Sequence, residues 1–158
     1  MSRPHYAPRG LIGVLTPQAN TNVEGEFPRL LPEGYGMITG RLTSPATVMD
    51  DRLVAYLDNL TPLLAQFGTA PLEAVAFACT GSSYLKGAAF EDDAVSAASA
   101  QAGAPVITSA LALVAAFETF GAGRLGLISP YHASLTAASL TYWESRGLDV
   151  AEVEIDLG

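Results

Sequence analysis

Leu72-Glu-Ala-Val-Ala-Phe-Ala78 is a short apolar stretch that runs into a polar segment, Cys79-Thr80-Gly81-Ser82-Ser83-Tyr84. An alanine-rich run from Ala88 to Ala102 follows, and Gly103 and a second apolar stretch, Pro105-Val-Ile107, come after it. The short apolar runs are typical of strands, and the longer run with its terminal glycine is typical of a helix. This strand, helix and strand predict a βαβ unit with two parallel strands.

The same alternation extends in both directions along the 158 residues. We expect further strands over residues 11–15, 35–42, 124–129 and 150–155, and further helices over residues 21–31, 50–67, 109–120 and 135–146, with Pro62 kinking or splitting the second of these helices. The strands are apolar throughout, which is typical of strands covered on both faces. The sequence therefore predicts an α/β fold with a doubly wound parallel sheet, strand order 2-1-3-4 in its first part, and helices on both faces.

Composition and charge exclude several classes of partner. The chain has 8 Lys and Arg against 16 Asp and Glu, a net charge of −8, and no cluster of basic residues. Nucleic acid and an anionic membrane surface are therefore not expected as partners. Charged residues make up only 15% of the chain, well below the usual share of about 25%, so we expect a partner to cover some apolar surface.

Cysteine usage and the apolar stretches indicate the compartment. Cys79 is the only cysteine, so an intrachain disulfide is excluded. The first ten residues lack the apolar core of a signal peptide, and the longest apolar stretch, Ala110 to Phe117, is far shorter than the roughly 20 residues that cross a bilayer. We expect a cytoplasmic protein. The two histidines and the cysteine have no zinc-site spacing, so no bound metal is expected.

Polar residues follow four of the expected strands, in the segments 16–22, 79–84, 108–109 and 129–132. These segments are rich in Asn, Ser, Thr, Tyr or Cys and contain no Asp, Glu, Lys or Arg. Ligands of parallel α/β sheets bind at the carboxyl ends of the strands. We expect Asn20, Thr80, Ser82 and Tyr131 to converge there, close to Cys79, as an uncharged set of hydrogen-bond donors suited to a carboxylate.

Two side chains in these segments have a chemical and a structural interpretation. Cys79 is a nucleophile or base if the N–H groups of a Gly/Ser loop and a nearby helix N-terminus lower its pKa, and otherwise it is a buried structural cysteine. His132 is either a base or a capping or solvated residue in a loop. Both interpretations stay open for both residues at this point.

Three motifs together resemble a known family. Pro17-Gln-Ala-Asn20-Thr-Asn-Val-Glu24, Phe77-Ala-Cys79-Thr-Gly-Ser-Ser83 and Ile128-Ser-Pro-Tyr131 follow expected strands one, three and five. In order and position they resemble the maleate isomerase/arylmalonate decarboxylase branch of the Asp/Glu racemase superfamily. The resemblance implies a first α/β racemase-like domain over residues 1–122 and part of a second α/β domain over residues 123–158.

The resemblance also implies an activity: a cofactor-independent isomerase or racemase, similar to maleate cis-trans isomerase, that acts on a small dicarboxylate through a cysteine thiolate. Cys79 would be catalytic. The substrate-binding residues would be Pro17, Asn20, Thr80, Gly81, Ser82 and Tyr131. In the decarboxylase branch a glycine matches Cys79, so Cys79 favours the isomerase or racemase side.

Two alternatives to this interpretation remain. One is an enzyme similar to arylmalonate decarboxylase, and the other is a non-catalytic module for binding a small acid or for oligomerisation. The family takes one cysteine from each of its two domains, whereas this sequence contains one. We therefore expect weak or absent two-cysteine catalysis by these 158 residues. We also expect either a homo-oligomer that forms or swaps elements through the 124–158 region, or a fragment of a longer two-domain enzyme.

Overall fold

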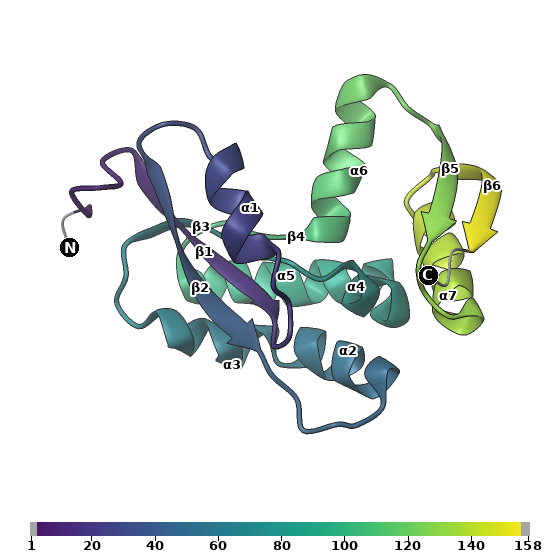
Figure 1. Cartoon of the computed structure of the whole chain (residues 1–158), viewed down its shortest axis with the longest axis horizontal. Helices are drawn as coiled ribbons and strands as arrows, with labels where there is room; N and C mark the ends of the chain where they lie inside the picture. The colour runs from purple at the N-terminus through teal and green to yellow at the C-terminus, as the bar shows by residue number, and fades with distance from the viewer. Residues whose placement is uncertain (1–2, 156–158) are drawn as a thin grey trace.

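The computed structural model describes residues 3–155 and contains two parallel sheets (Figure 1). The first has the order β2-β1-β3-β4, built from β1 (Gly10–Pro17), β2 (Tyr35–Leu42), β3 (Leu72–Phe77) and β4 (Val106–Thr108). The second pairs β5 (Arg124–Ser129) with β6 (Asp149–Ile155). The predicted fold class and the predicted strand order 2-1-3-4 are confirmed.

The helices alternate with these strands. They are α1 (Val23–Leu30), α2 (Met49–Asp58), α3 (Leu60–Leu63), the short 3₁₀ helix η1 (Leu64–Phe67), α4 (Thr80–Lys86), α5 (Ala88–Ala102), α6 (Ser109–Phe120) and α7 (Ala133–Ser145). Gly103 and Gly121 end α5 and α6 with φ values of 63° and 65°. The left-handed conformation suits glycine and closes a helix.

The boundaries differ from the prediction in two places. The expected helix over residues 50–67 is divided at Asn59 into α2, α3 and η1, and Pro62 lies inside α3. Residues 80–86, which we expected to be a Gly/Ser loop at their start, form the helix α4. The other elements begin and end within about two residues of the prediction, the usual uncertainty at element ends.

The core of the first sheet lies on one of its faces. Figure 1 shows α1 on one side of the sheet and α2, α3 and α5 on the other. On the side of α2, α3 and α5, buried strand residues such as Leu15, Val75 and Phe77 pack against buried helix residues such as Leu57 and Ala98. On the opposite side α1 has no buried residue. We refer to residues 3–122 as the four-stranded unit.

A second apolar cluster joins this unit to the rest of the chain. Ala110 of α6, Tyr142 and Trp143 of α7, and Leu148 form its buried centre, and Tyr84 of α4 packs against it. The ring of Trp143 lies 5.4 Å from that of Tyr84 and 6.1 Å from that of Phe117. We refer to residues 123–155 as the two-stranded unit; α7 is the element that connects it to α4. Across residues 3–155, the helices are too short or too polar for any of them to traverse a bilayer.

Candidate functional site

Cys79 lies at the carboxyl end of β3, as predicted. The N–H of Ala78 donates to the carbonyl of Leu15 at 2.8 Å and continues the pairing of β3 with β1. Cys79 then adopts an extended conformation and is the N-cap of α4, with its side chain only 8% exposed. The strand pairing and the helix start therefore fix the thiol from both sides.

Polar groups at the start of α4 surround the Cys79 thiol. The hydroxyl of Ser82 donates to Sγ at 3.3 Å, and both groups are buried. Burial raises the pKa of the thiol, while hydrogen bonds from the Ser82 hydroxyl and from the backbone N–H groups of Ser82 and Gly81 oppose this rise. The net direction is upward, so the expected lowering of the Cys79 pKa is wrong. The neutral thiol is the resting form at neutral pH.

Tyr131 brings the two-stranded unit into this site. Its hydroxyl lies 3.5 Å from the hydroxyl of Thr80. Its backbone is held by Ser129, whose Oγ accepts from the Tyr131 N–H at 3.3 Å, and by Thr136, whose hydroxyl donates to the Tyr131 carbonyl at 3.2 Å. Tyr84 packs edge-on to Tyr131, and burial raises the pKa of Tyr84 to about 12, so this phenol remains protonated.

The loop after β1 forms another wall. The carboxamide oxygen of Asn20 accepts from the N–H groups of Asn22 and Val23 at 3.0 and 2.9 Å. The N–H of Asn20 donates to the carbonyl of Pro17 at 2.9 Å, and Arg41 donates to the carbonyl of Asn20 at 3.2 Å. Because the carboxamide oxygen shapes the loop, the NH₂ group is the part of Asn20 suited to a ligand.

A cavity of about 230 Å³ lies between this loop and α2. The loop contributes Pro17, Gln18, Ala19 and Asn20, and one face of the helix contributes Met49, Arg52, Leu53 and Tyr56. These four helix positions follow the i, i+3, i+4, i+7 spacing of one helix face. Sequence reasoning missed Arg52, although helical spacing places it beside Leu53 and Tyr56.

Gly81 and Tyr56 connect this cavity to the cysteine. A Cβ on Gly81 would lie 3.0 Å from Leu53 Cδ1, so the absence of a side chain allows α4 to approach α2 closely. Burial raises the pKa of Tyr56, with a smaller rise from Cys79 and opposing effects of Arg52 and of the Gln18 backbone. The Tyr56 side chain thus lines the cavity and is near enough to the Cys79 thiol for the thiol to affect its pKa.

The predicted site residues thus fall into two groups. Thr80 and Tyr131 meet each other, and Ser82 meets Cys79. Pro17 and Asn20 line the cavity beside α2 together with Tyr56. His132 is the N-cap of α7: its Nδ1 accepts from Leu135 N–H at 3.4 Å, and its Nε2 lies 3.0 Å from Asp50 Oδ1. The capping interpretation of His132 is confirmed.

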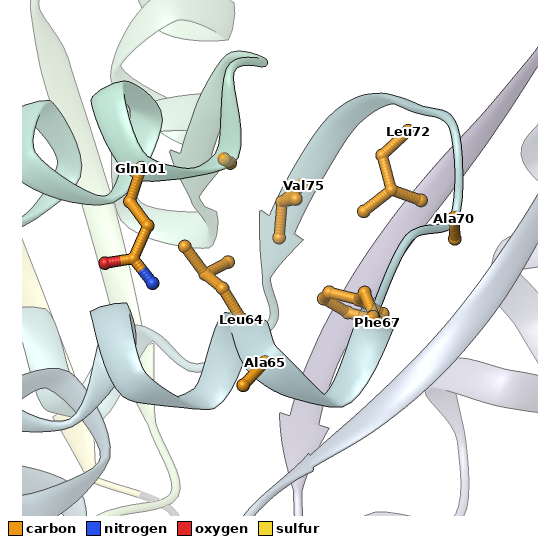
Figure 2. A pocket seen from close by; sticks show the side chains of 9 residues that line it. Leu64, Ala65, Phe67, Ala70, Leu72, Val75 and Gln101 are labelled. Atoms are coloured by element: carbon orange, nitrogen blue, oxygen red, sulfur yellow. The ribbon is translucent and has the colours of Figure 1, made fainter. Parts of the chain in front are cut away.

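Another cavity, of about 190 Å³, lies at the opposite end of β3 (Figure 2). Leu64, Phe67, Leu72 and Val75 line it together with the amide of Gln101, whose NH₂ donates to the carbonyl of Thr61 at 3.3 Å. Its lining contains no ionisable or nucleophilic side chain. It therefore offers no group for chemistry, and the candidate site is the one at the Cys79 end of β3. Within residues 3–155 no three His, Cys, Asp or Glu side chains are grouped to hold a metal ion.

Comparison with known proteins gives concordant results. The family model for arylmalonate decarboxylase matches residues 12–156. The maleate isomerase of Geobacillus stearothermophilus is 27% identical over 153 residues, an alignment that covers 89% of this chain. The chain spans 61% of the length of that relative.

Solved structures show the same fold. The maleate isomerase Iso of Pseudomonas putida S16 has a TM-score of 0.81 at 22% identity, with 92% of this chain and 63% of that chain covered. A cysteine-to-alanine mutant of it was solved with maleate. A cysteine-to-serine mutant of Nocardia farcinica maleate cis-trans isomerase, with a covalently bound succinylcysteine intermediate, has a TM-score of 0.80 at 24% identity and the same coverage.

Proposed function

The chain belongs to the arylmalonate decarboxylase family, and from this membership we propose that it acts on a small dicarboxylate through the Cys79 thiol, without a cofactor. The proposed reaction is the cis–trans isomerisation of a maleate-like diacid. One observation carries the proposal: the Ser82 hydroxyl donates to the thiol at the end of β3, and the next residue in the chain, Thr80, has its hydroxyl 3.5 Å from that of Tyr131. The names of the maleate isomerase relatives support this choice of substrate.

Binding of the diacid is assigned to both walls of the site. The NH₂ group of Asn20 and the guanidinium of Arg52 would bind one carboxylate at the cavity beside α2. The hydroxyls of Thr80 and Tyr131 and the N–H of Gly81 would bind the other carboxylate. Because the chain has a net charge of −8, the local cation of Arg52 offsets the repulsion of a dianion.

The chemistry is an addition followed by an elimination. Sγ of Cys79 forms a bond to one alkene carbon, the π electrons move to the other carbon and its carboxylate, and the thiol proton ends on that carbon. The product is a succinyl thioether, in which the former double bond is a single bond that can rotate. Loss of a proton from the carbon that was protonated, and of the Cys79 thiolate from its neighbour, gives fumarate from the rotated form and restores the thiol, with no oxidation or reduction. The succinylcysteine of the Nocardia farcinica enzyme is an adduct of this kind.

Because burial raises the pKa of Cys79, the thiol has to lose its proton as the sulfur attacks, and this proton is the one that ends on the neighbouring carbon. The thiolate is the nucleophile, and the Ser82 hydroxyl stabilises it as the proton leaves. The donors at Thr80 and Tyr131 would stabilise the negative charge that develops on the carboxylate next to the reacting carbon. In this scheme the Ser82 hydroxyl stabilises the negative charge on sulfur, and the donors at Thr80 and Tyr131 stabilise the negative charge on the carboxylate.

The test is incubation with maleate, followed by intact-mass measurement and by NMR detection of fumarate. We expect a mass increase of one maleic acid on the wild-type chain, and its absence in Cys79→Ser. Ser83→Ala is the matched control, because the buried Ser83 hydroxyl has no hydrogen-bond partner among the described residues. Formation of the adduct requires only Cys79. Turnover to fumarate also requires any catalytic residues that the longer relatives carry outside the region matched by this chain. A folded wild-type chain that forms neither adduct nor fumarate would contradict the proposal.

Decarboxylation of an arylmalonate is the second candidate. The family model favours it, and so does the apolar part of the cavity wall at Met49 and Leu53, which suits an aromatic ring. Phenylmalonate belongs in the same assay, with release of carbon dioxide as the readout. Protection of Cys79 from alkylation by either acid, without adduct or product, would instead support a non-catalytic acid-binding module.

The two further proposals concern organisation. We place the boundary between a first and a second α/β domain at residues 122 and 123, and we propose self-association through residues 124–158. Ile128 and Val153 of the two-stranded sheet are 70% and 41% exposed, which supports a role in such a contact. Light scattering of the wild-type chain and of Ile128→Ser tests it: a dimer that the substitution dissociates is expected, and a wild-type monomer would refute it.

A further inference from the structure

Glu91 is a fully buried carboxylate outside the site described above. It lies in the first turn of α5 and is 0% exposed. Three donors from two segments, the end of β4 and the end of α7, converge on it: Thr108 Oγ1 donates to Oε1 at 2.5 Å, and Tyr142 OH and Arg146 Nη2 donate to Oε2 at 2.5 and 2.7 Å. A buried charge costs several kcal/mol unless it is paired and hydrogen-bonded, and here both oxygens are satisfied.

Arg146 extends this network to the surface. Its guanidinium also donates to both carboxylate oxygens of Asp92, at 3.0 and 2.8 Å, and to the carbonyl of Ala88 at 3.2 Å. Asp92 and Glu91 raise the pKa of Arg146, and burial followed by Glu91 raises that of Tyr142, so both donors keep their protons. The network therefore fixes the carboxyl-terminal end of α7 on the first turn of α5.

Tyr131, the site residue from the two-stranded unit, lies just before the amino-terminal end of α7. Tyr131 precedes α7 by two positions, and its hydroxyl faces Thr80. Between the two ends, α7 contacts the four-stranded unit through aromatic rings, such as Tyr142 and Trp143 against Tyr84. Apolar surfaces tolerate small shifts, whereas three directed donors on one carboxylate do not.

A polar contact between His132 and Asp50 also holds the amino-terminal end of α7, but it is weaker than the network at Glu91. His132 Nε2 lies 3.0 Å from Asp50, and both side chains are more than a third exposed. Exposed pairs of this kind contribute at most about 1 kcal/mol. The buried network at Glu91 is therefore the stronger determinant of the rotation and register of α7.

We propose that Glu91 is a positioning residue: by fixing the register of α7, it sets the place of the Tyr131 hydroxyl opposite Thr80. That this placement matters for function rests on the proposed function. That Glu91 fixes α7 rests on the contacts described above. Glu91 touches no substrate in this account. Its removal should move Tyr131 relative to Thr80 while leaving the Asn20 loop unchanged.

The experiment compares Glu91→Gln with Asp93→Asn on the full chain. Both substitutions remove one carboxylate charge from α5, but Asp93 is exposed. The first readout is backbone amide NMR at a temperature where circular dichroism shows both variants folded. We expect the resonances of Thr80 and Tyr131 to shift in Glu91→Gln, with those of Asn22 and Val23 unchanged and with no shift in Asp93→Asn. The only tryptophan, Trp143, should show a red-shifted emission in Glu91→Gln alone.

A second readout uses the ligand. We expect the maleate Kd to weaken by about fivefold or more in Glu91→Gln, the lower end of ordinary coupling between distant positions, and to stay unchanged in Asp93→Asn. If maleate does not bind the wild type, the proposed function fails and the NMR comparison still decides this proposal. A folded Glu91→Gln with unchanged Thr80 and Tyr131 resonances would overturn it.

If Glu91→Gln does not fold, Tyr142→Phe takes its place, because it removes one of the three donors and keeps the ring. The same Thr80 and Tyr131 shifts are then expected, smaller in size, and their absence would overturn the proposal. Arg146→Lys keeps the charge but loses the forked donor. A partial return of the wild-type resonances in Arg146→Lys relative to Arg146→Ala supports directed positioning, and equal resonances in the two variants argue against it.

Discussion

The four-stranded unit and the two-stranded unit are built from the same alternation of strand and helix, yet their strands differ in burial. Leu15 of β1 and Val75 of β3 are fully buried, whereas Ile128 of β5 is 70% exposed. The two-stranded unit buries its helix instead: Leu135, Tyr142 and Trp143 of α7 are buried. An apolar strand therefore indicates a sheet, but the partner layer decides whether the strand is covered.

The sharpest test of this difference uses two side chains of equal size. Leu15→Ala and Ile128→Ala remove the same number of carbon atoms. We expect Leu15→Ala to lower the free energy of unfolding by about 2–5 kcal/mol, since it opens a cavity in the core. Measured in a sample dilute enough to be monomeric, Ile128→Ala should change it by less than about 1 kcal/mol, since the side chain is on the surface of the single chain. Urea unfolding measures both free energies. Equal losses would mean that the strands of the two units do not differ in their contribution to stability.

Hydrogen exchange compares the two sheets without mutation. A sheet of two strands is marginally stable by itself, and its exposed side chains add little. We expect the amides of β5 and β6 to open at a free energy at least about 1.4 kcal/mol lower than those of β1 and β3, which is a tenfold difference in protection. Equal protection in the two sheets would indicate that they unfold as one unit.

Reactivity of Cys79 should depend on the four-stranded unit alone. Because its pKa is raised, alkylation should be slow at neutral pH and should still accelerate with pH above 9. The Ser82 hydroxyl stabilises the thiolate, so Ser82→Ala should slow iodoacetamide labelling by about two- to tenfold, as loss of one hydrogen bond of 0.5–1.5 kcal/mol predicts.

Two variants serve as controls for this labelling. Ser83→Ala removes a buried hydroxyl without a hydrogen-bond partner among the described residues, and Tyr131→Phe removes the contribution of the two-stranded unit. We expect wild-type labelling rates for both. A slower rate in Tyr131→Phe would show that the two-stranded unit also acts on the thiol.

The smallest effect is expected at the exposed contact between the units. Asp50→Ala removes the partner of His132 Nε2. Because the pair is exposed, we expect a loss below about 1 kcal/mol in thermal or urea unfolding. A larger loss would mean that this pair, and not the network at Glu91, holds α7 in place.

The sequence was informative where local rules apply. The apolar runs and the terminal glycines located the strands and helices, and the right-handed crossover rule gave the strand order. The expected split of the helix over residues 50–67 is present, but at Asn59 and not at Pro62. The helix α4 was missed, since serine and glycine after Cys79 favour a loop by local propensity, and packing of Gly81 against Leu53 overrides it.

The site was predictable in part for a similar reason. The carboxyl-end rule located Cys79, Asn20 and Tyr131, but burial of the thiol depends on what packs over it, and this reversed the direction of its pKa. Arg52 and Glu91 lie on helices, where the sequence pattern assigns charges to solvent. Only the tertiary arrangement shows that one lines a cavity and the other is enclosed.

The pairing of β1 with β3 also has a consequence for the newly made chain. Leu15 and Phe77 face each other in the register although they are far apart in sequence, and folds that depend on such distant contacts form slowly. Cys79 follows β3 and becomes buried only when that pairing is complete. Each new molecule therefore passes through an interval in which its thiol is open to oxidants and electrophiles, and the rate at which the sheet assembles sets how long that interval lasts.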